Sequence, residues 1–253
     1  MSSSERALIG IVPAAGFATR LAGIGCSKEI LPILPELDVE TQPVCHALLS
    51  SFARAGADHI VWIIREGKDD IPQTLGDGSA YGVPFSYRVT GATAGTPHTL
   101  DRAYSFVKDA RVLLGFPDIH FAPESAFVEL VAHLERTKAD ITLGLLQTDR
   151  PEKMDVVEID DTGNVIALRI KQPSSGNNLA WILAAWQPRF SDYLHHYLEE
   201  TQNKNTNEVY VGTVIQSAIA GGLRVNAIEI LGGKCIDVGT PEDLALMQTC
   251  RPE

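Results

Sequence analysis

The run from Ile9 to Leu34, IGIVPAAGFATRLAGIGCSKEILPIL, most constrains how this chain can fold. Residues 9–12 are apolar and typical of a buried strand, which Pro13 is expected to end. The loop that follows, Ala14-Ala15-Gly16-Phe17-Ala18, has few side chains that could keep a ligand away from its backbone. The sequence therefore predicts a strand followed by a loop whose amide groups are open to a ligand.

Two cations, Arg20 and Lys28, lie just beyond this loop. Free backbone N–H groups followed by two positive charges suit a polyphosphate. The alternative is an ordinary strand-to-helix turn whose basic side chains are simply solvated. We expect the loop and both cations to bind phosphate.

Length and charge bound the class of protein. The 253 residues contain no Pro-, Gly- or Ser-rich linker, so we expect a single domain over residues 1–253. A formal net charge of -11 argues against non-specific binding to nucleic acid or to an anionic membrane. The 4 cysteines form no C-x-x-C pair, and the first residues resemble neither a secretory signal nor a membrane span, so we expect a cytoplasmic protein.

Apolar runs alternate with helical patterns through the first half of the chain. The predicted strands cover residues 9–12, 59–64, 85–89 and 111–115, and the predicted helices cover 44–55, 96–106 and 123–136. This alternation predicts an α/β fold with a mostly parallel sheet flanked by helices, similar to the Rossmann arrangement. Ligands of such sheets bind beyond the carboxyl ends of the strands.

The second half changes character. Residues 156–159 and 165–170 flank a turn-rich connection and predict an antiparallel hairpin, which makes the sheet mixed. Further on, the pattern predicts strands at 181–185 and 223–230 and helices at 190–199, 210–220 and 241–250.

Asp118 and Asp237 each follow a short apolar run, so each carboxylate is expected at the carboxyl end of a strand. Magnesium bound to a nucleotide takes one or two carboxylates together with phosphate oxygens and water. We expect this pair to hold Mg²⁺ if the fold brings the two residues together. The alternative is that each aspartate only forms a turn, or that Asp237 neighbours a helix cap.

The segment from Ala14 to Pro32 resembles the sugar-1-phosphate nucleotidyltransferases, whose signature is roughly A-G-G-x-G-T-R-L, a spacer and [PS]-K-x-x-L-P. This chain has Ala-Ala-Gly-Phe-Ala-Thr-Arg-Leu at 14–21 and Ser-Lys-Glu-Ile-Leu-Pro at 27–32. Segments at 75–79, 95–97, 117–118 and 237–244 extend the resemblance over nearly the whole chain. These motifs are most similar to those of glucose-1-phosphate thymidylyltransferases.

The resemblance implies a Mg²⁺-dependent reaction between a nucleoside triphosphate, dTTP or UTP, and a sugar 1-phosphate. It implies that Arg20, Lys28 and Asp118 are catalytic and that Asp118 and Asp237 bind the metal. It also implies that Lys171 and Glu208 bind the sugar phosphate. A homodimer is one possible assembly, and the sequence leaves the oligomeric state open. The implied nucleotide-binding residues are Ala14, Ala15, Gly16, Phe17, Ala18, Thr19, Thr90, Gly95 and Thr96.

Several positions depart from the family pattern. Ala18 replaces a loop glycine, and Thr90 stands where thymidylyltransferases place the glutamine that reads the base. The family's E-K-P segment appears here as Lys171-Gln172-Pro173 after Ile170, so its cation is displaced by one residue. These departures leave a second interpretation open, in which the chain binds a nucleotide or nucleotide sugar without turnover.

Overall fold

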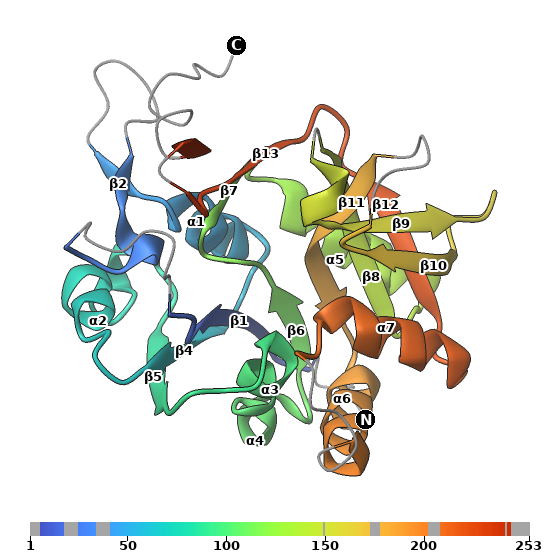
Figure 1. Cartoon of the computed structure of the whole chain (residues 1–253), viewed down its shortest axis with the longest axis horizontal. Coiled ribbons are helices and arrows are strands. Elements are labelled where there is room, and N and C mark those ends of the chain that lie inside the picture. The colour runs from blue at the N-terminus through green and yellow to red at the C-terminus, as the bar shows by residue number, and fades with distance from the viewer. Residues whose placement is uncertain are drawn as a thin grey trace.

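The computed structural model describes residues 6–17, 25–33, 41–148, 150–172, 178–201, 208–240 and 242–243. A 9-stranded mixed sheet runs through the centre of these residues (Figure 1). Its strands are β1 (Leu8–Ala14), β4 (His59–Arg65), β5 (Phe85–Thr90), β6 (Arg111–Leu114), β8 (Ile141–Gln147), β9 (Asp155–Ile159), β10 (Val165–Ile170), β11 (Leu179–Trp186) and β12 (Val225–Glu229).

Strand β1 lies in the parallel part of the sheet. It pairs in parallel with β4 on one side and with β6 on the other, and β4 pairs in parallel with β5. The carboxyl ends of these strands therefore meet at one edge, as the alternation of strands and helices predicted. This edge carries the candidate site.

The rest of the sheet is mixed. Strand β11 is antiparallel to both β6 and β8, and β8 pairs in parallel with β12. The predicted hairpin is confirmed, because β9 and β10 pair in antiparallel register. The fold class predicted from the sequence, a mixed and mostly parallel α/β sheet flanked by helices, is confirmed.

Helices cover both faces of the sheet (Figure 1). One apolar core joins one face of the sheet to α1 and α5, and a second core joins the opposite face to α3, α4, α6 and α7. The helices are α1 (His46–Arg54), α2 (Asp70–Leu75), α3 (Thr96–Asp101), α4 (Tyr104–Val107), α5 (Ala126–Thr137), α6 (Pro188–Thr201) and α7 (Val211–Ala220), and short 3-10 turns are η2 (Lys28–Ile30), η3 (Ser79–Tyr81) and η4 (Pro151–Lys153).

The close packing of α1 on the sheet depends on Gly10 in β1. A Cβ atom at this position would lie 2.6 Å from a ring carbon of Phe52 on α1, closer than packed atoms allow. Without a side chain here, α1 packs directly on β1 and fixes the strand from which the small-residue loop departs.

Some element boundaries differ from the sequence predictions. Strand β1 continues through Pro13 to Ala14, because its pairing with β6 ends at Ile11 and no neighbour on that side needs a further N–H donor. The helix predicted over 96–106 is divided into α3 and α4, since the amides of Arg102 and Ala103 bond to carbonyls three residues back. Helix α5 begins at Ala126, not Pro123. Apart from residues 242–243, the helix predicted at 241–250 lies outside the described residues.

Two small antiparallel sheets complete the described structure. One pairs β2 (Pro32–Ile33) with β3 (Gln42–Pro43), and the other pairs β7 (Ile119–Ala122) with β13 (Lys234–Asp237). Figure 1 shows β13, in red, running beside the green strand β7. Among the described residues, none of the helices has the length and apolar character needed to cross a bilayer.

Candidate functional site

A cavity of about 590 Å³ lies at the carboxyl edge of the parallel strands. Its walls come from the loop after β1, the turn η2, the loop between β5 and α3, the loop after β6, and the residue Glu208. Segments that lie far apart in the sequence therefore meet around one space. Most of the described residues that the sequence singled out fall on these walls.

The small-residue loop forms part of the wall as predicted. Ala15, Gly16 and Phe17 line the cavity, and a Cβ atom built on Gly16 would meet nothing within 4 Å. The backbone here is therefore uncovered. Ala14 is the last residue of β1 and is 1% exposed, so its side chain packs in the core instead of lining the cavity. The predicted residues Ala18, Thr19 and Arg20 lie outside the described residues.

Lys28 begins the turn η2 and forms an ion pair with Asp118. Both side chains line the cavity, and each is 20% exposed. Burial acts to lower the pKa of Lys28, but the charges of Asp118, Glu29 and Asp237 outweigh it and raise the pKa above its ordinary value. Lys28 is thus a permanent cation held among three carboxylates.

The two predicted aspartates come together although they are far apart in the sequence. Asp237 ends β13 opposite Ile119 of β7, and the N–H of Val238 donates to the carbonyl oxygen of Asp118 at 2.8 Å. Burial, helped by the negative charge of Asp118, raises the pKa of Asp237 to about 6. The small β7–β13 sheet therefore places two carboxylates close enough to repel each other.

The segment after β13 is fixed by a second set of polar contacts. Asp243 is 4% exposed and accepts hydrogen bonds from the Arg150 guanidinium at 2.5 Å and from the Thr240 hydroxyl at 2.9 Å. These contacts tie the chain beyond Asp237 to the turn η4. They hold Asp237 in place from its carboxyl side.

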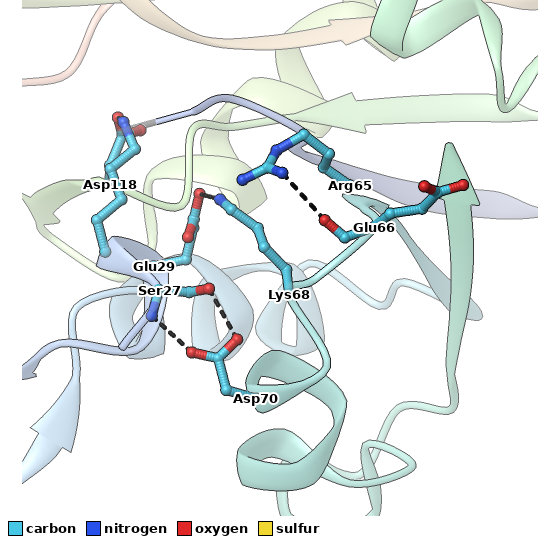
Figure 2. Close-up of polar contacts among 8 residues, drawn as sticks. Ser27, Glu29, Arg65, Glu66, Lys68, Asp70 and Asp118 are labelled. Carbon is cyan, nitrogen blue, oxygen red and sulfur yellow. Dashed lines mark hydrogen bonds and ion pairs between the residues drawn. The ribbon is translucent and has the colours of Figure 1, made fainter. Parts of the chain in front are cut away.

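Beneath the cavity lies a buried ion pair that the sequence reasoning missed. The Glu29 carboxylate accepts a hydrogen bond from the Lys68 ammonium at 2.6 Å, and these side chains are 1% and 5% exposed (Figure 2). Glu29 also lines the cavity, and its Oε2 atom has no partner among the described residues. Next to this pair, the backbone N–H and the hydroxyl of Ser27 both donate to the Asp70 carboxylate, at 2.6 and 2.8 Å.

Only the tertiary structure shows that Glu29 is buried. The sequence signal was its place between Lys28 and the buried Ile30, in a segment otherwise predicted to bind phosphate. A buried carboxylate needs a buried cation, and Lys68 lies 39 residues away on the loop after β4. No local pattern connects the two residues.

The opposite wall depends on Gly95. Its φ of +137° and the 2.6 Å that would separate an added Cβ from the Val209 carbonyl oxygen both exclude a side chain. The close approach brings Gly95 and Thr96 to the cavity together with Glu208. Three of the predicted site residues thus meet at one point on the wall.

Thr90, Lys171 and Asp237 do not line the cavity in the described structure, although Asp237 lies next to Asp118, which does. Thr90 ends β5, a strand away from the loop after β1. Lys171 follows β10 with a φ of +47°, and its ammonium lies 3.9 Å from the centre of the Tyr210 ring. The Tyr210 hydroxyl in turn donates to Glu208 at 3.2 Å. Tyr210 therefore lies between Lys171 and Glu208, the residue that lines the cavity.

The residues present fit a divalent cation held with a nucleotide. The charge of Asp118 helps to raise the pKa of Asp237, and the Lys28 ammonium pairs with Asp118 and is also attracted by Asp237. Among the described residues no group of three or more His, Cys, Asp or Glu side chains could hold a metal alone. Two carboxylates are enough where phosphate oxygens and water complete the octahedron.

Comparison with known proteins places this geometry in context. The model of the family described as nucleotidyl transferase matches residues 9–249. The chain is 27% identical over 238 residues to the low-salt glycan biosynthesis nucleotidyltransferase Agl11 of Haloferax volcanii, a match that covers 93% of this chain. It is 22% identical over 241 residues to the glucose-1-phosphate thymidylyltransferase of Streptomyces antibioticus, with 92% of this chain covered.

These two relatives are longer proteins, and this chain spans 63% of the length of each. Among solved structures, a protein from Bacillus anthracis assigned as a glucose-1-phosphate thymidylyltransferase, in complex with sucrose, has a TM-score of 0.81 at 21% identity. The match covers 98% of both chains. A UDP-glucose pyrophosphorylase in complex with UDP-glucose has a TM-score of 0.78 at 18% identity, with 96% and 97% covered. These structures share the fold of this chain.

Proposed function

Because the chain belongs to the nucleotidyl transferase family, we propose that it transfers a nucleotidyl group from dTTP or UTP to a sugar 1-phosphate. The observation that carries the proposal is the meeting of Lys28, Asp118 and Asp237 beside an uncovered backbone loop. The names of the curated relatives support the substrate class. The products would be a nucleotide sugar and pyrophosphate.

In this reaction an oxygen of the sugar phosphate attacks the α-phosphorus of the nucleoside triphosphate. A new P–O bond forms as the bond from the α-phosphorus to the bridging oxygen of the β-phosphate breaks, and pyrophosphate leaves with that electron pair. No proton has to be removed from the attacking phosphate oxygen, which is ionised at neutral pH. Positioning and charge neutralisation are therefore the main demands on the protein.

The described residues meet these demands at the phosphate end of the cavity. The backbone amide of Gly16 can donate to phosphate oxygens, since the space beside this residue in the cavity wall is open. Lys28 would exchange its bond to Asp118 for the α-phosphate and so offset the charge that develops there. Arg20, outside the described residues, is proposed for the leaving pyrophosphate.

Asp118 and Asp237 would hold a Mg²⁺ ion, which when bound neutralises phosphate charge and fixes the orientation of the reacting groups. Lys68 pairs with Glu29 beneath the cavity, and the charge of Glu29 acts to raise the pKa of Lys28. At the other wall, Glu208 is proposed to accept hydrogen bonds from sugar hydroxyls, with Lys171 close enough to attract the sugar phosphate.

The test is pyrophosphate release in the presence of Mg²⁺, with each nucleoside triphosphate paired with a panel of sugar 1-phosphates. We expect release with dTTP or UTP, and a nucleotide sugar of matching mass in the product. Nucleotide binding without release from any pair would reject the enzyme and leave the binding protein that the departures at Thr90 and Lys171 allow. The control is the same panel with Asp118→Asn.

A further inference from the structure

Arg65 does not itself line the cavity but lies against Phe17, which does, and no motif pointed to it. It is the last residue of β4, in register with Thr90 of β5. Residues in register on parallel strands project to the same face of a sheet. Along β4 this is the face of Val61 and Ile63, which share their core with Ile11 of β1.

The cavity opens on that same face. Pro13 and Ala15 lie two and four residues after Ile11, a spacing that places them on the same face of the strand, and both line the cavity. Arg65 is therefore the corresponding residue on the next strand. Arg65 ends β4, and Asp118 follows β6. Since β1 lies between β4 and β6, the two residues are separated by two strand spacings, or about 10 Å across the sheet. Figure 2 shows Asp118 and Arg65 on either side of the Glu29–Lys68 pair.

The Arg65 guanidinium is held by two contacts, and at least one of its N–H donors has no acceptor among the described residues. Its centre lies 4.4 Å from the centre of the Phe17 ring, which lines the cavity and is 61% exposed. One terminal nitrogen donates to the Glu66 carbonyl oxygen at 3.0 Å. The Nε atom is buried and has no acceptor among the described residues. A buried donor without an acceptor is unfavourable, and an acceptor on a ligand would satisfy it.

A guanidinium donates hydrogen bonds and cannot accept them. Uracil and thymine carry a carbonyl oxygen at the ring position where cytosine carries an amino group, and guanine likewise carries a carbonyl where adenine carries an amino group. An arginine that faces this edge of the base favours the carbonyl and leaves the amino group without a partner. The chain has Thr90 beside Arg65, and a threonine is too short to extend as far as the guanidinium.

We propose that Arg65 reads the nucleobase and makes the site selective for bases that present a carbonyl oxygen over bases that present an amino group. The inference rests on the proposed function, since it assumes that a nucleoside triphosphate binds with its phosphates at Lys28. Phe17 would support the base or move aside for it, because its ring is both exposed and packed on Arg65.

The test compares UTP with CTP, which differ only along the base edge in question. Calorimetry with Mg²⁺ and no sugar phosphate measures binding without turnover. We expect UTP to bind at least about tenfold more tightly than CTP, the discrimination typical of one hydrogen bond from a charged donor. Arg65→Gln, whose amide both donates and accepts, should bring the two affinities to within about threefold of each other. Arg65→Lys, which only donates, should keep the preference for UTP.

Arg54→Gln is the matched control, because it removes an exposed guanidinium that pairs with Glu124 away from the cavity. It should leave the UTP-to-CTP ratio unchanged. Equal binding of UTP and CTP by the wild-type protein would overturn the assignment without any variant. An equal loss of UTP, CTP and inorganic triphosphate in Arg65→Gln would show a phosphate contact and overturn it as well. If no nucleoside triphosphate binds, the proposed function itself fails, and this assignment fails with it.

Discussion

The two ends of the cavity differ in how their charged groups are held. At the phosphate end, Lys28 is paired with Asp118, and Asp237 is fixed by the β7–β13 sheet. Behind the opposite wall and outside the lining of the cavity, Lys171 follows the edge strand β10, and its ammonium lies on the Tyr210 ring. At the first end an ammonium and a carboxylate are in direct contact. At the second, the Lys171 ammonium contacts the Tyr210 ring, and the Tyr210 hydroxyl contacts Glu208.

The difference shows what fixes a functional side chain. At the phosphate end, Asp237 is held by the pairing of β13 with β7, and Lys28 is held by its ion pair with Asp118, so contacts between separate segments fix these positions. A residue beyond an edge strand has fewer neighbours, and a change of one position in its register moves it substantially. We therefore expect the phosphate end to carry most of the transition-state stabilisation and the opposite wall to govern the choice of acceptor.

The largest expected effect is the loss of activity in Asp118→Asn. We expect kcat/KM to fall by about 1,000-fold or more, equivalent to about 4 kcal/mol, because the amide neither holds a divalent ion nor pairs with Lys28. Steady-state kinetics measure the change, and the unfolding temperature checks that the fold is intact. Asp161→Asn, in the exposed β9–β10 connection, is the control. A fall of less than about tenfold would remove Asp118 from the metal site.

The next effect is on stability. Lys68→Met leaves the buried Glu29 carboxylate without its cation, and we expect the free energy of unfolding to fall by about 3 kcal/mol. Urea denaturation measures the change. The double variant Glu29→Gln/Lys68→Met should recover part of the loss, because it removes both charges together. If Lys68→Met alone is as stable as the wild type, the pair does not support the cavity.

A smaller effect concerns pH and metal. Because the pKa of Asp237 is raised from 3.8 to about 6, the folded protein binds a proton that the unfolded chain releases in this range. Without metal, this group's contribution to stability should decline as pH rises from 4 to 6. A divalent ion needs the ionised carboxylate, so stabilisation by Mg²⁺ should be weak at pH 5 and full at pH 7. Thermal unfolding with and without Mg²⁺ measures both trends. Asp237→Asn should abolish them, and trends that persist in this variant would assign them to another group.

The smallest effect is expected at the opposite wall. Lys171→Gln should raise KM for the sugar phosphate by less than about tenfold and leave kcat nearly unchanged, because its ammonium lies partly exposed over Tyr210. The comparison is with Lys28→Gln, which should lower kcat. If both variants lose kcat equally, the contrast between the two ends of the cavity is wrong.

The sequence predicted most of the elements around the phosphate end, because long apolar runs and small-residue loops leave a strong periodic signal. The pattern over 59–64 predicted β4, and the loop after β1 was expected to be open. The sequence placed Asp237 at the end of a short strand, which is β13, but β7 was not predicted, because it has only 4 residues and gains its order from pairing with β13. Asp118 and Asp237 were named from their types and flanking residues, and their contact depends on this pairing.

By itself the sequence determined the class of fold, the uncovered loop and the residue types available for phosphate and metal. These depend on local patterns of apolar, small and charged residues. Only the tertiary structure decided that Glu29 is buried on Lys68, that Lys171 lies on Tyr210 and that Arg65 stands beside Thr90. Each of these contacts joins residues 25 or more positions apart, where burial and strand register, not local preference, set which side chains meet.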